Sequence, residues 1–365
     1  MDPITQQAVL AAAGAGGGAK TYVDDVFSTF LYEGNNSTHN ITNGIDLAGE
    51  GGLSWIKVRD TSDLHILVDT ERGATKQLSS NSTASEVTQS RFSSFNSDGF
   101  TVATNDNEIN NSAYDYVSWT FRKAPGFFDV VTYTGNGVAG RSVAHNLGSK
   151  PGMILVKRTD GTADWIVYHR SIGYEGFLIL NSTNEEYQYS NRWHAEPDAN
   201  NFYVGSGYNL NNNNNETYVA YVFAHDDAQF GTDSDESIIK CGSYSSNGSE
   251  QEINLGFEPQ FVLIKSSSHA GGWYLFDSMR GIFTGSAEPS LQAQESNSEA
   301  ADNNGNIALT ATGFRTDYDG GGLNESGKTY AYMAIRRPNK PPEVGTEVFA
   351  VDTRGGTSPT PPTYK

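Results

Sequence analysis

The chain has 365 residues, and 24 Lys and Arg stand against 43 Asp and Glu, which gives a formal net charge of −19. So acidic a chain repels nucleic acid and anionic membranes, and no stretch has the roughly 18 consecutive apolar residues of a membrane span, so we expect no nucleic acid partner and no membrane insertion. The 39 glycines and the 12% of aromatic residues favour many short strands and turns over long helices.

The first 20 residues predict a short helix followed by a flexible tether. Asp2 can cap a helix that begins at Pro3, and the glycine-rich run 14–18 ends it. Asp2 also stands where a signal peptide would carry basic residues, so we expect no secretory leader. One side of the helix is apolar, and we expect it to anchor the chain to a partner protein; the alternative is a frayed terminus. The candidate anchor residues are Ile4, Val9 and Leu10.

One module of about 100 residues occurs three times along the chain. Each copy has a lysine after an apolar run, at steps of 100 and 108 residues, and each ends in an aromatic strand. Because several separate segments recur at nearly one spacing, triplication of a single unit is the simplest explanation. The lysines are Lys57, Lys157 and Lys265, and the closing strands are Tyr116–Phe121, Tyr218–Phe223 and Tyr330–Ile335.

Each module alternates apolar and aromatic runs with turns of Gly, Asn, Asp and Ser, which predicts an antiparallel sandwich. The continuous apolar run Met153–Val156 predicts a strand buried on both faces. We therefore predict an all-β fold of three tandem antiparallel β-sandwich, jelly-roll-like repeats, packed as a compact, rigid arm. The expected bounds are 1–20 for the anchor helix and tether, 21–124, 125–228 and 229–338 for the repeats, and 339–365 for a proline-rich extension that forms an extended strap or a linker.

The sequence contains no local motif for catalysis or for a cofactor. Cys241 has no cysteine partner for a disulfide or a zinc site, and it follows an apolar run, so we expect it in the core. His65 and His169 stand where the other copies have other residue types, which favours a structural role. The acidic segments 226–235 and 317–320 match no calcium-binding loop. We therefore predict no catalytic residue, no cofactor and no metal, while distant paired carboxylates for glycoside cleavage stay open.

A group of aromatic residues in the second repeat lies outside the expected core pattern. Exposed rings beside amides suit sugars, because the ring face packs on C–H surface and the amides bind hydroxyls. The alternative is that these rings pack the sandwich or an interface between chains. The candidate glycan contacts are Tyr187, Tyr189, Trp193 and Tyr208.

Two segments, Asp115–Gly137 and His145–Arg158, resemble a repeated domain of tailed bacteriophages, in particular virion structural and tail-fibre proteins of marine phages. The start of the chain, Met1–Gln7, and the segment Tyr22–Leu31 are similar to the same group. The resemblance extends to about Thr353. It implies a non-enzymatic part of the virus particle in the tail apparatus, and it supplies no catalytic or binding motif.

Together these features lead to the hypothesis of a tail fibre or tail-associated adhesin that is anchored by its N-terminus and takes part in host attachment. We expect a homotrimer, in contact with other virion proteins such as a tail adaptor, with a host surface glycan as a ligand. Its location would be the virion tail, after assembly in the host cytoplasm. The alternatives are a capsid decoration or cement protein, a glycan-degrading depolymerase and a free carbohydrate-binding module.

Overall fold

The computed structural model is nearly all β, with 44% strand and 3% helix, which confirms the predicted fold class. Its two helices within the described residues are α2 (Val23–Val26) and α3 (Leu47–Glu50). The predicted N-terminal helix lies outside the described residues. The structure describes residues 20–103, 106–189, 191–206, 211–282, 288–301, 307–316 and 322–341.

The first repeat consists of two antiparallel sheets. Its main sheet has six strands in the order β1-β9-β3-β4-β5-β6, and its small sheet has three in the order β2-β8-β7. The strands are β1 (Phe27–Glu33), β2 (His39–Thr42), β3 (Gly52–Val58), β4 (Ile66–Asp69), β5 (Lys76–Leu78), β6 (Val87–Thr88), β7 (Phe92–Asn96), β8 (Gly99–Val102) and β9 (Asp115–Arg122).

The second and third repeats have the same topology. The main sheets are β10-β18-β12-β13-β14-β15 and β19-β27-β21-β22-β23-β24, and the small sheets are β11-β17-β16 and β20-β26-β25. The second repeat has β10 (Phe128–Thr134), β11 (Arg141–Ala144), β12 (Met153–Arg158), β13 (Ile166–His169), β14 (Gly176–Ile179), β15 (Tyr187–Gln188), β16 (Trp193–Ala195), β17 (Asn201–Val204) and β18 (Thr217–Phe223). The third has β19 (Ile239–Ser245), β20 (Gln251–Asn254), β21 (Pro259–Ser266), β22 (Trp273–Asp277), β23 (Pro289–Gln292), β24 (Ala300–Ala301), β25 (Ile307–Thr310), β26 (Gly313–Thr316) and β27 (Thr329–Arg336).

The inner strands of each main sheet are buried on both of their faces. Alternate residues of a strand point to opposite faces. In β3, Leu53 and Trp55 belong to a core that residues of all three repeats share, whereas Ile56 and Val58 belong to the core between the two sheets of the first repeat. The same double burial explains the apolar run Met153–Val156 of the second repeat, which is buried along its whole length.

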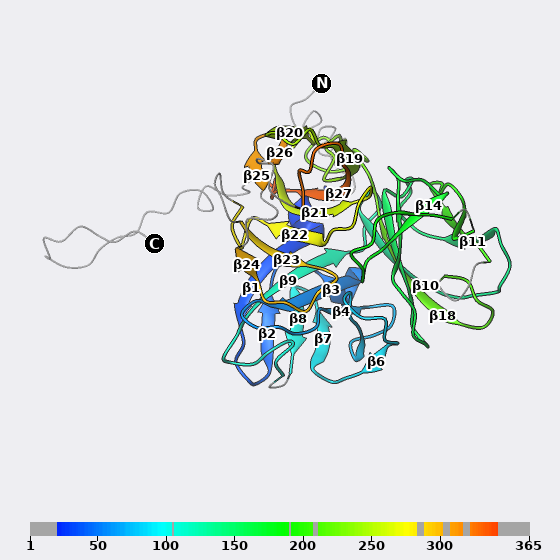
Figure 1. Cartoon of the computed structure of the whole chain (residues 1–365). Coiled ribbons are helices and arrows are strands. Elements are labelled where there is room, and N and C mark those ends of the chain that lie inside the picture. Colours follow the sequence, from blue (N-terminus) through cyan, green and yellow to red (C-terminus); the bar gives the residue numbers. More distant parts are fainter. Residues whose placement is uncertain are drawn as a thin grey trace, which may run out of the picture.

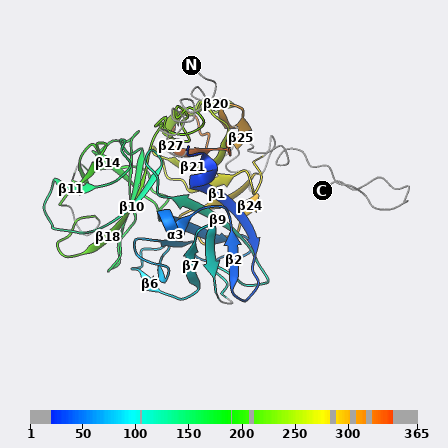
Figure 2. The ribbon, with the colours of Figure 1, turned by 180° about the vertical axis from the view of Figure 1, so that it is seen from behind.

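The shared core joins the three repeats in a ring. The ring centroid of Phe121, in the first repeat, lies 5.5 Å from that of Phe223 in the second and 6.2 Å from that of Phe261 in the third. Figures 1 and 2 show the first repeat (blue to cyan), the second (green) and the third (yellow to orange) gathered around one centre. The structure is therefore a closed ring and not the compact, rigid arm that the sequence predicts: three apolar sheet faces pack against one another in a ring, whereas a row would expose the faces at its ends.

Equivalent backbone hydrogen bonds close this ring. At each contact, an N–H that follows the repeat's lysine donates to a carbonyl oxygen between the outer strands of another repeat. The first repeat thus binds the third, the second binds the first and the third binds the second. The three bonds are Asp63 to Ser296 (2.8 Å), Ala163 to Thr83 (3.0 Å) and Gly271 to Thr183 (2.8 Å).

The described chain enters and leaves the ring at the same place. The Asp24 carboxylate, in α2, accepts hydrogen bonds from the backbone N–H groups of Asn339 (3.0 Å) and Lys340 (3.1 Å). The backbone N–H of Val23 donates to Asn339 Oδ1 at 3.2 Å. The start of the first repeat and the segment after the third therefore lie side by side.

Candidate functional site

The structure separates the predicted glycan contacts from one another. Tyr187 and Tyr189 are 38% and 40% exposed, but Trp193 is only 1% exposed. The Trp193 ring packs against Tyr168 and Phe202, at centroid distances of 5.7 and 6.4 Å. The prediction that Trp193 contacts a sugar is therefore wrong, because this ring fills the core of the second sandwich. Outside the described residues lie Tyr208 and the anchor residues Ile4, Val9 and Leu10.

The two exposed tyrosines are part of a small cluster that we call the aromatic platform: Phe177, Tyr187, Tyr189 and Arg192. Phe177, in β14, is directly opposite Tyr187, in β15, and their rings stack at 5.1 Å with an angle of 13° between their planes. The Arg192 guanidinium lies 5.2 Å from the Phe177 ring centroid and 5.3 Å from that of Tyr189. The platform therefore places two tyrosine rings at the outer edge of the main sheet.

Polar groups surround the aromatic platform. Asn184 Nδ2 donates a hydrogen bond of 2.5 Å to the Tyr187 hydroxyl, and Gln188 binds the Glu186 carboxylate through its side-chain amide. Burial lowers the pKa of Arg192 and raises the pKa of Glu186. The cluster thus combines ring faces with amide and carboxyl groups that can bind hydroxyls.

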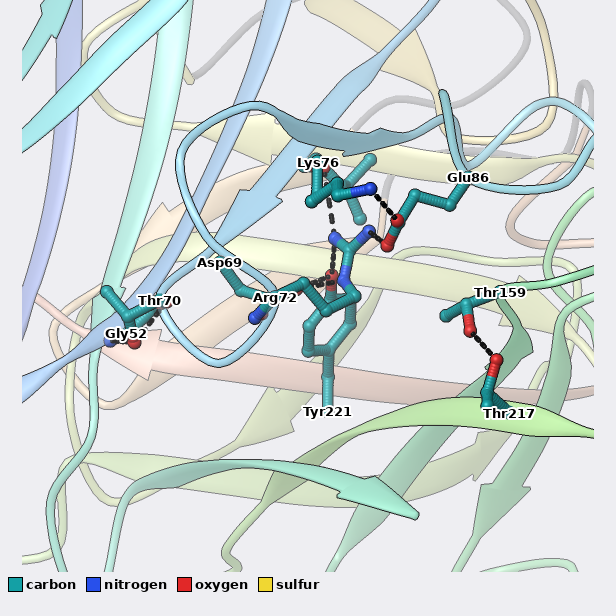
Figure 3. A network of polar contacts seen from close by, with 10 residues as sticks. Gly52, Asp69, Thr70, Arg72, Lys76, Glu86, Thr159, Thr217 and Tyr221 are labelled. Carbon is teal, nitrogen blue, oxygen red and sulfur yellow. Dashed lines mark hydrogen bonds and ion pairs between the residues drawn. The ribbon is translucent and has the colours of Figure 1, made fainter. Parts of the chain in front are cut away.

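A second kind of cluster occupies the joint between the first and second repeats (Figure 3). Arg72 Nε lies 2.6 Å from Asp69 Oδ2, and Arg72 Nη1 lies 3.2 Å from Glu86 Oε2. The Tyr221 hydroxyl, which comes from the second repeat, donates to Asp69 Oδ2 at 2.8 Å and accepts from Arg72 Nη2 at 3.1 Å. Burial raises the pKa of Tyr221 well above its usual value, so its hydroxyl keeps the proton that it donates.

The joint between the third and first repeats repeats this arrangement. Arg280 Nε lies 2.6 Å from Asp277 Oδ2, and Arg280 Nη1 lies 3.3 Å from Glu299 Oε2. Trp119, at the position that Tyr221 has in the second repeat, donates from Nε1 to Asp277 Oδ2 at 3.0 Å. The Arg280 guanidinium also lies over the Trp119 ring at 5.4 Å.

The joint between the second and third repeats has different chemistry. His169 and Ile172 replace the aspartate and the arginine, and Met333 replaces the aromatic residue. Burial lowers the pKa of His169 to about 4, so its ring is neutral at pH 7. Its Nδ1 accepts from the Ser171 N–H at 3.2 Å, which leaves Nε2–H to donate to the Tyr332 carbonyl oxygen at 3.1 Å. A neutral hydrogen bond thus stands at this joint where the other two joints have a buried ion pair.

The three lysines that mark the repeats are buried at the joints. Burial lowers the pKa of each ε-amino group to about 8. Lys157 Nζ donates to the Thr83 carbonyl oxygen of the first repeat at 3.2 Å, and Lys265 Nζ donates to that of Thr183 in the second at 3.4 Å. Each also binds the carbonyl oxygen of its own following residue. These lysines thus fix the loops that meet at the joints.

Two further candidates for chemistry, His65 and Cys241, are also engaged in structural contacts. His65 Nδ1 accepts from Trp55 Nε1 at 2.9 Å, and its Nε2 lies 3.1 Å from the Gln292 carbonyl oxygen of the third repeat. Cys241 lies in the core, where burial raises the pKa of its thiol. Within the described ranges, no group of three or more His, Cys, Asp or Glu side chains is placed to hold a metal ion.

None of the helices that the structure describes is long and apolar enough to cross a membrane.

No curated protein and no solved structure matches the chain. A family model, described as a domain of unknown function (DUF7483), matches residues 23–338. This range begins with α2 and ends two residues after β27, so it includes the entire ring. The unit that the family model represents is therefore the set of three repeats, and the chain belongs to the DUF7483 family.

Proposed function

We propose that the chain is a non-enzymatic structural protein of a bacteriophage virion, a tail fibre or tail-associated adhesin that takes part in host attachment. The proposal starts from the resemblance of Asp115–Gly137 and His145–Arg158 to tail-fibre proteins. In this proposal the N-terminal segment anchors the chain to a tail adaptor or a neighbouring tail protein, and three copies assemble side by side. The protein then resides in the virion tail after assembly in the host cytoplasm.

The observation that carries the proposal is the use of reactive side chains at the joints of the ring. Lys157, His65 and His169 bind backbone groups across repeats, and the Asp69–Arg72 pair is shielded from solvent. Side chains that hold three sandwiches together in this way stabilise one rigid shape. A rigid, folded module of this kind is suited to mechanical and display roles in a particle.

The adjacent ends of the described chain support a specific placement. Because Asp24 binds the backbone of Asn339 and Lys340, the chain on either side of the ring starts from one point. In this proposal the segments that flank the ring hold it at that point. We therefore propose that the ring is displayed on the flank of the tail apparatus and presents its far surface to the host.

Immunogold electron microscopy of intact particles, with an antibody against the ring, tests the location. We expect label on the tail, and loss of the chain from particles when residues 1–18 are deleted, with an unchanged circular dichroism spectrum of the truncated protein. Label spread over the head would instead support a capsid decoration protein. Release of reducing sugar ends from host polysaccharide by the purified chain would show that the protein is an enzyme and would refute the proposal.

A further inference from the structure

Three copies of one module in one chain provide an internal comparison for the aromatic platform. The two outer strands of each main sheet pair in the same register, and the directly opposite residues at this place differ in each copy. Only the second copy has two aromatic residues there. The three pairs are Gln77 with Val87, Phe177 with Tyr187, and Ser290 with Ala300. The strands pair in all three copies, so the fold does not require the aromatic pair.

The other exposed tyrosine, Tyr189, also differs from the equivalent residue of the first repeat, Gln89, although the backbone hydrogen bond at this position is the same. The Tyr189 N–H donates to the Glu175 carbonyl oxygen at 2.8 Å, and the equivalent Gln89 N–H donates to that of Thr75 at 2.9 Å. The backbone hydrogen bond is thus the same with a glutamine as with a tyrosine. The tyrosine side chain is an addition that the strand edge does not need.

An arginine shared by the two copies has a different partner in each. In the first repeat, Arg91 Nε donates to the Gln77 side chain at 2.7 Å. In the second, Arg192 lies over the rings of Phe177 and Tyr189 instead. Each tyrosine of the platform is thereby supported on one side, Tyr187 by Phe177 and Tyr189 by Arg192. Rings that are supported in this way lose little conformational freedom when a ligand binds to them.

We propose that the aromatic platform binds an uncharged saccharide of the host surface, with C–H faces of the sugar on the rings of Tyr187 and Tyr189. Hydroxyl groups of the sugar would bind the neighbouring Asn184 and Gln188. A stable protein interface buries roughly 800 Å² on each partner, and two tyrosine rings provide far less area than that. The size of the platform therefore suits a sugar better than a protein. This inference rests on the proposed attachment role.

Charge selects an uncharged sugar over an acidic one. Glu175 and Glu185 are exposed beside the platform, and Glu186 lies between Glu185 and Tyr187. Arg192 is the basic member of the platform, and its guanidinium is stacked on rings. With the overall charge of −19, these carboxylates repel an acidic sugar.

The test uses the full chain and an array of immobilised oligosaccharides of glucose, galactose, mannose and N-acetylglucosamine, with sialylated oligosaccharides as acidic probes. We expect binding to at least one uncharged probe. The variant Y187V/Y189Q carries the residues that the first repeat has at these positions, so it should fold normally. It should bind that probe at least about tenfold more weakly, because both stacking rings are lost. The control V138S, at an exposed residue of the same repeat outside the platform, should bind as the parent does.

Three results would overturn the inference: no uncharged probe binds, an acidic probe binds more tightly, or Y187V/Y189Q binds as well as the parent. Loss of self-association in Y187V/Y189Q, measured by analytical ultracentrifugation, would likewise assign the platform to a contact between copies. The location of the chain in particles is a separate measurement. A chain found on the tail that binds none of the uncharged probes overturns the saccharide site alone, and a sugar-binding chain absent from particles overturns the tail role alone.

Discussion

Replacing Arg72 with isoleucine should strongly destabilise the ring. The side chain of Asp69 is fully buried and that of Arg72 is 5% exposed, so the variant would leave a carboxylate in the protein interior with the Tyr221 hydroxyl as its remaining side-chain partner. Removing one member of such a buried pair costs about 3–5 kcal/mol. The loss should appear as a lower free energy of unfolding in urea at pH 7.

The second repeat supplies a matched control, because it has His169 and Ile172 at the corresponding positions. The double variant D69H/R72I removes both charges and should cost less than half as much as R72I, since replacing a whole buried pair is often close to neutral. R337A breaks the pair with Glu258, in which the Arg337 side chain is 60% exposed, and should cost about 1 kcal/mol or less. Equal losses for R72I and R337A, or for R72I and D69H/R72I, would refute the reasoning from desolvation.

Three further predictions concern burial. The pKa of His169 is about 4 in the folded protein and 6.5 in the unfolded chain, so the unfolded state binds more protons between these values. The free energy of unfolding of the wild type should therefore fall by about 3 kcal/mol as the pH falls through this range. In urea unfolding at pH 7 and 4.5, the free energy of unfolding of H169Q should fall by less. Burial lowers the pKa of Lys157 from 10.5 to about 8, so the free energy of unfolding should rise from pH 8 to pH 9.5. It should rise less in K157M, and an equal dependence on pH in the two proteins would contradict this prediction. W193A should cost about 3–5 kcal/mol, whereas Y189Q should stay within about 0.5 kcal/mol of the parent; similar effects in calorimetry would show that the two rings do not differ in burial.

The repeats and their strands could be predicted because double burial leaves a local signature. Met153–Val156 is apolar at every position since both faces of β12 are covered, and the closing strands β9, β18 and β27 are central strands of their sheets. The structural roles expected for Cys241 and His65 fit their buried contacts as well. These features depend on the residues of one segment and the face that it buries, and a sequence displays both.

The burial of Trp193 could not be read from its neighbours. Tyr187, Tyr189 and Trp193 are separated by even numbers of residues, which would place them on one face of a continuous strand. The chain instead ends β15 at Gln188 in the main sheet and begins β16 at Trp193 in the small sheet. Because the two strands belong to different sheets, the tyrosines point outward at an edge while the tryptophan enters the core.

The Asp and Arg residues of the two ion-paired joints form a recognisable pattern in the sequence, but the aromatic residues that they contact do not. The same spacing, Asp69 to Arg72 and Asp277 to Arg280, occurs at equivalent places of two copies and was a usable signal for a shared role. The partner rings, Tyr221 and Trp119, lie 152 and 158 residues from these aspartates. No local pattern connects residues so far apart, and closure of the ring therefore emerged only from the folded structure.

The joints differ in their chemistry, and this difference favours one arrangement of the repeats around the ring. Besides its bond with Arg72, the Asp69 carboxylate accepts a hydrogen bond from the hydroxyl of Tyr221, whereas the equivalent Met333 has no hydrogen to donate. If the first repeat packed against the third repeat's Met333 face, in the same chain or in a second copy, it would lose this donor in a buried site and the mispairing would cost free energy. The second repeat has His169 and Ile172 instead, and it suits the Met333 face because its histidine needs only a backbone carbonyl. Two joints with a buried ion pair and one without it thus favour the observed order of repeats around the ring over the reverse order, which three identical joints would not distinguish.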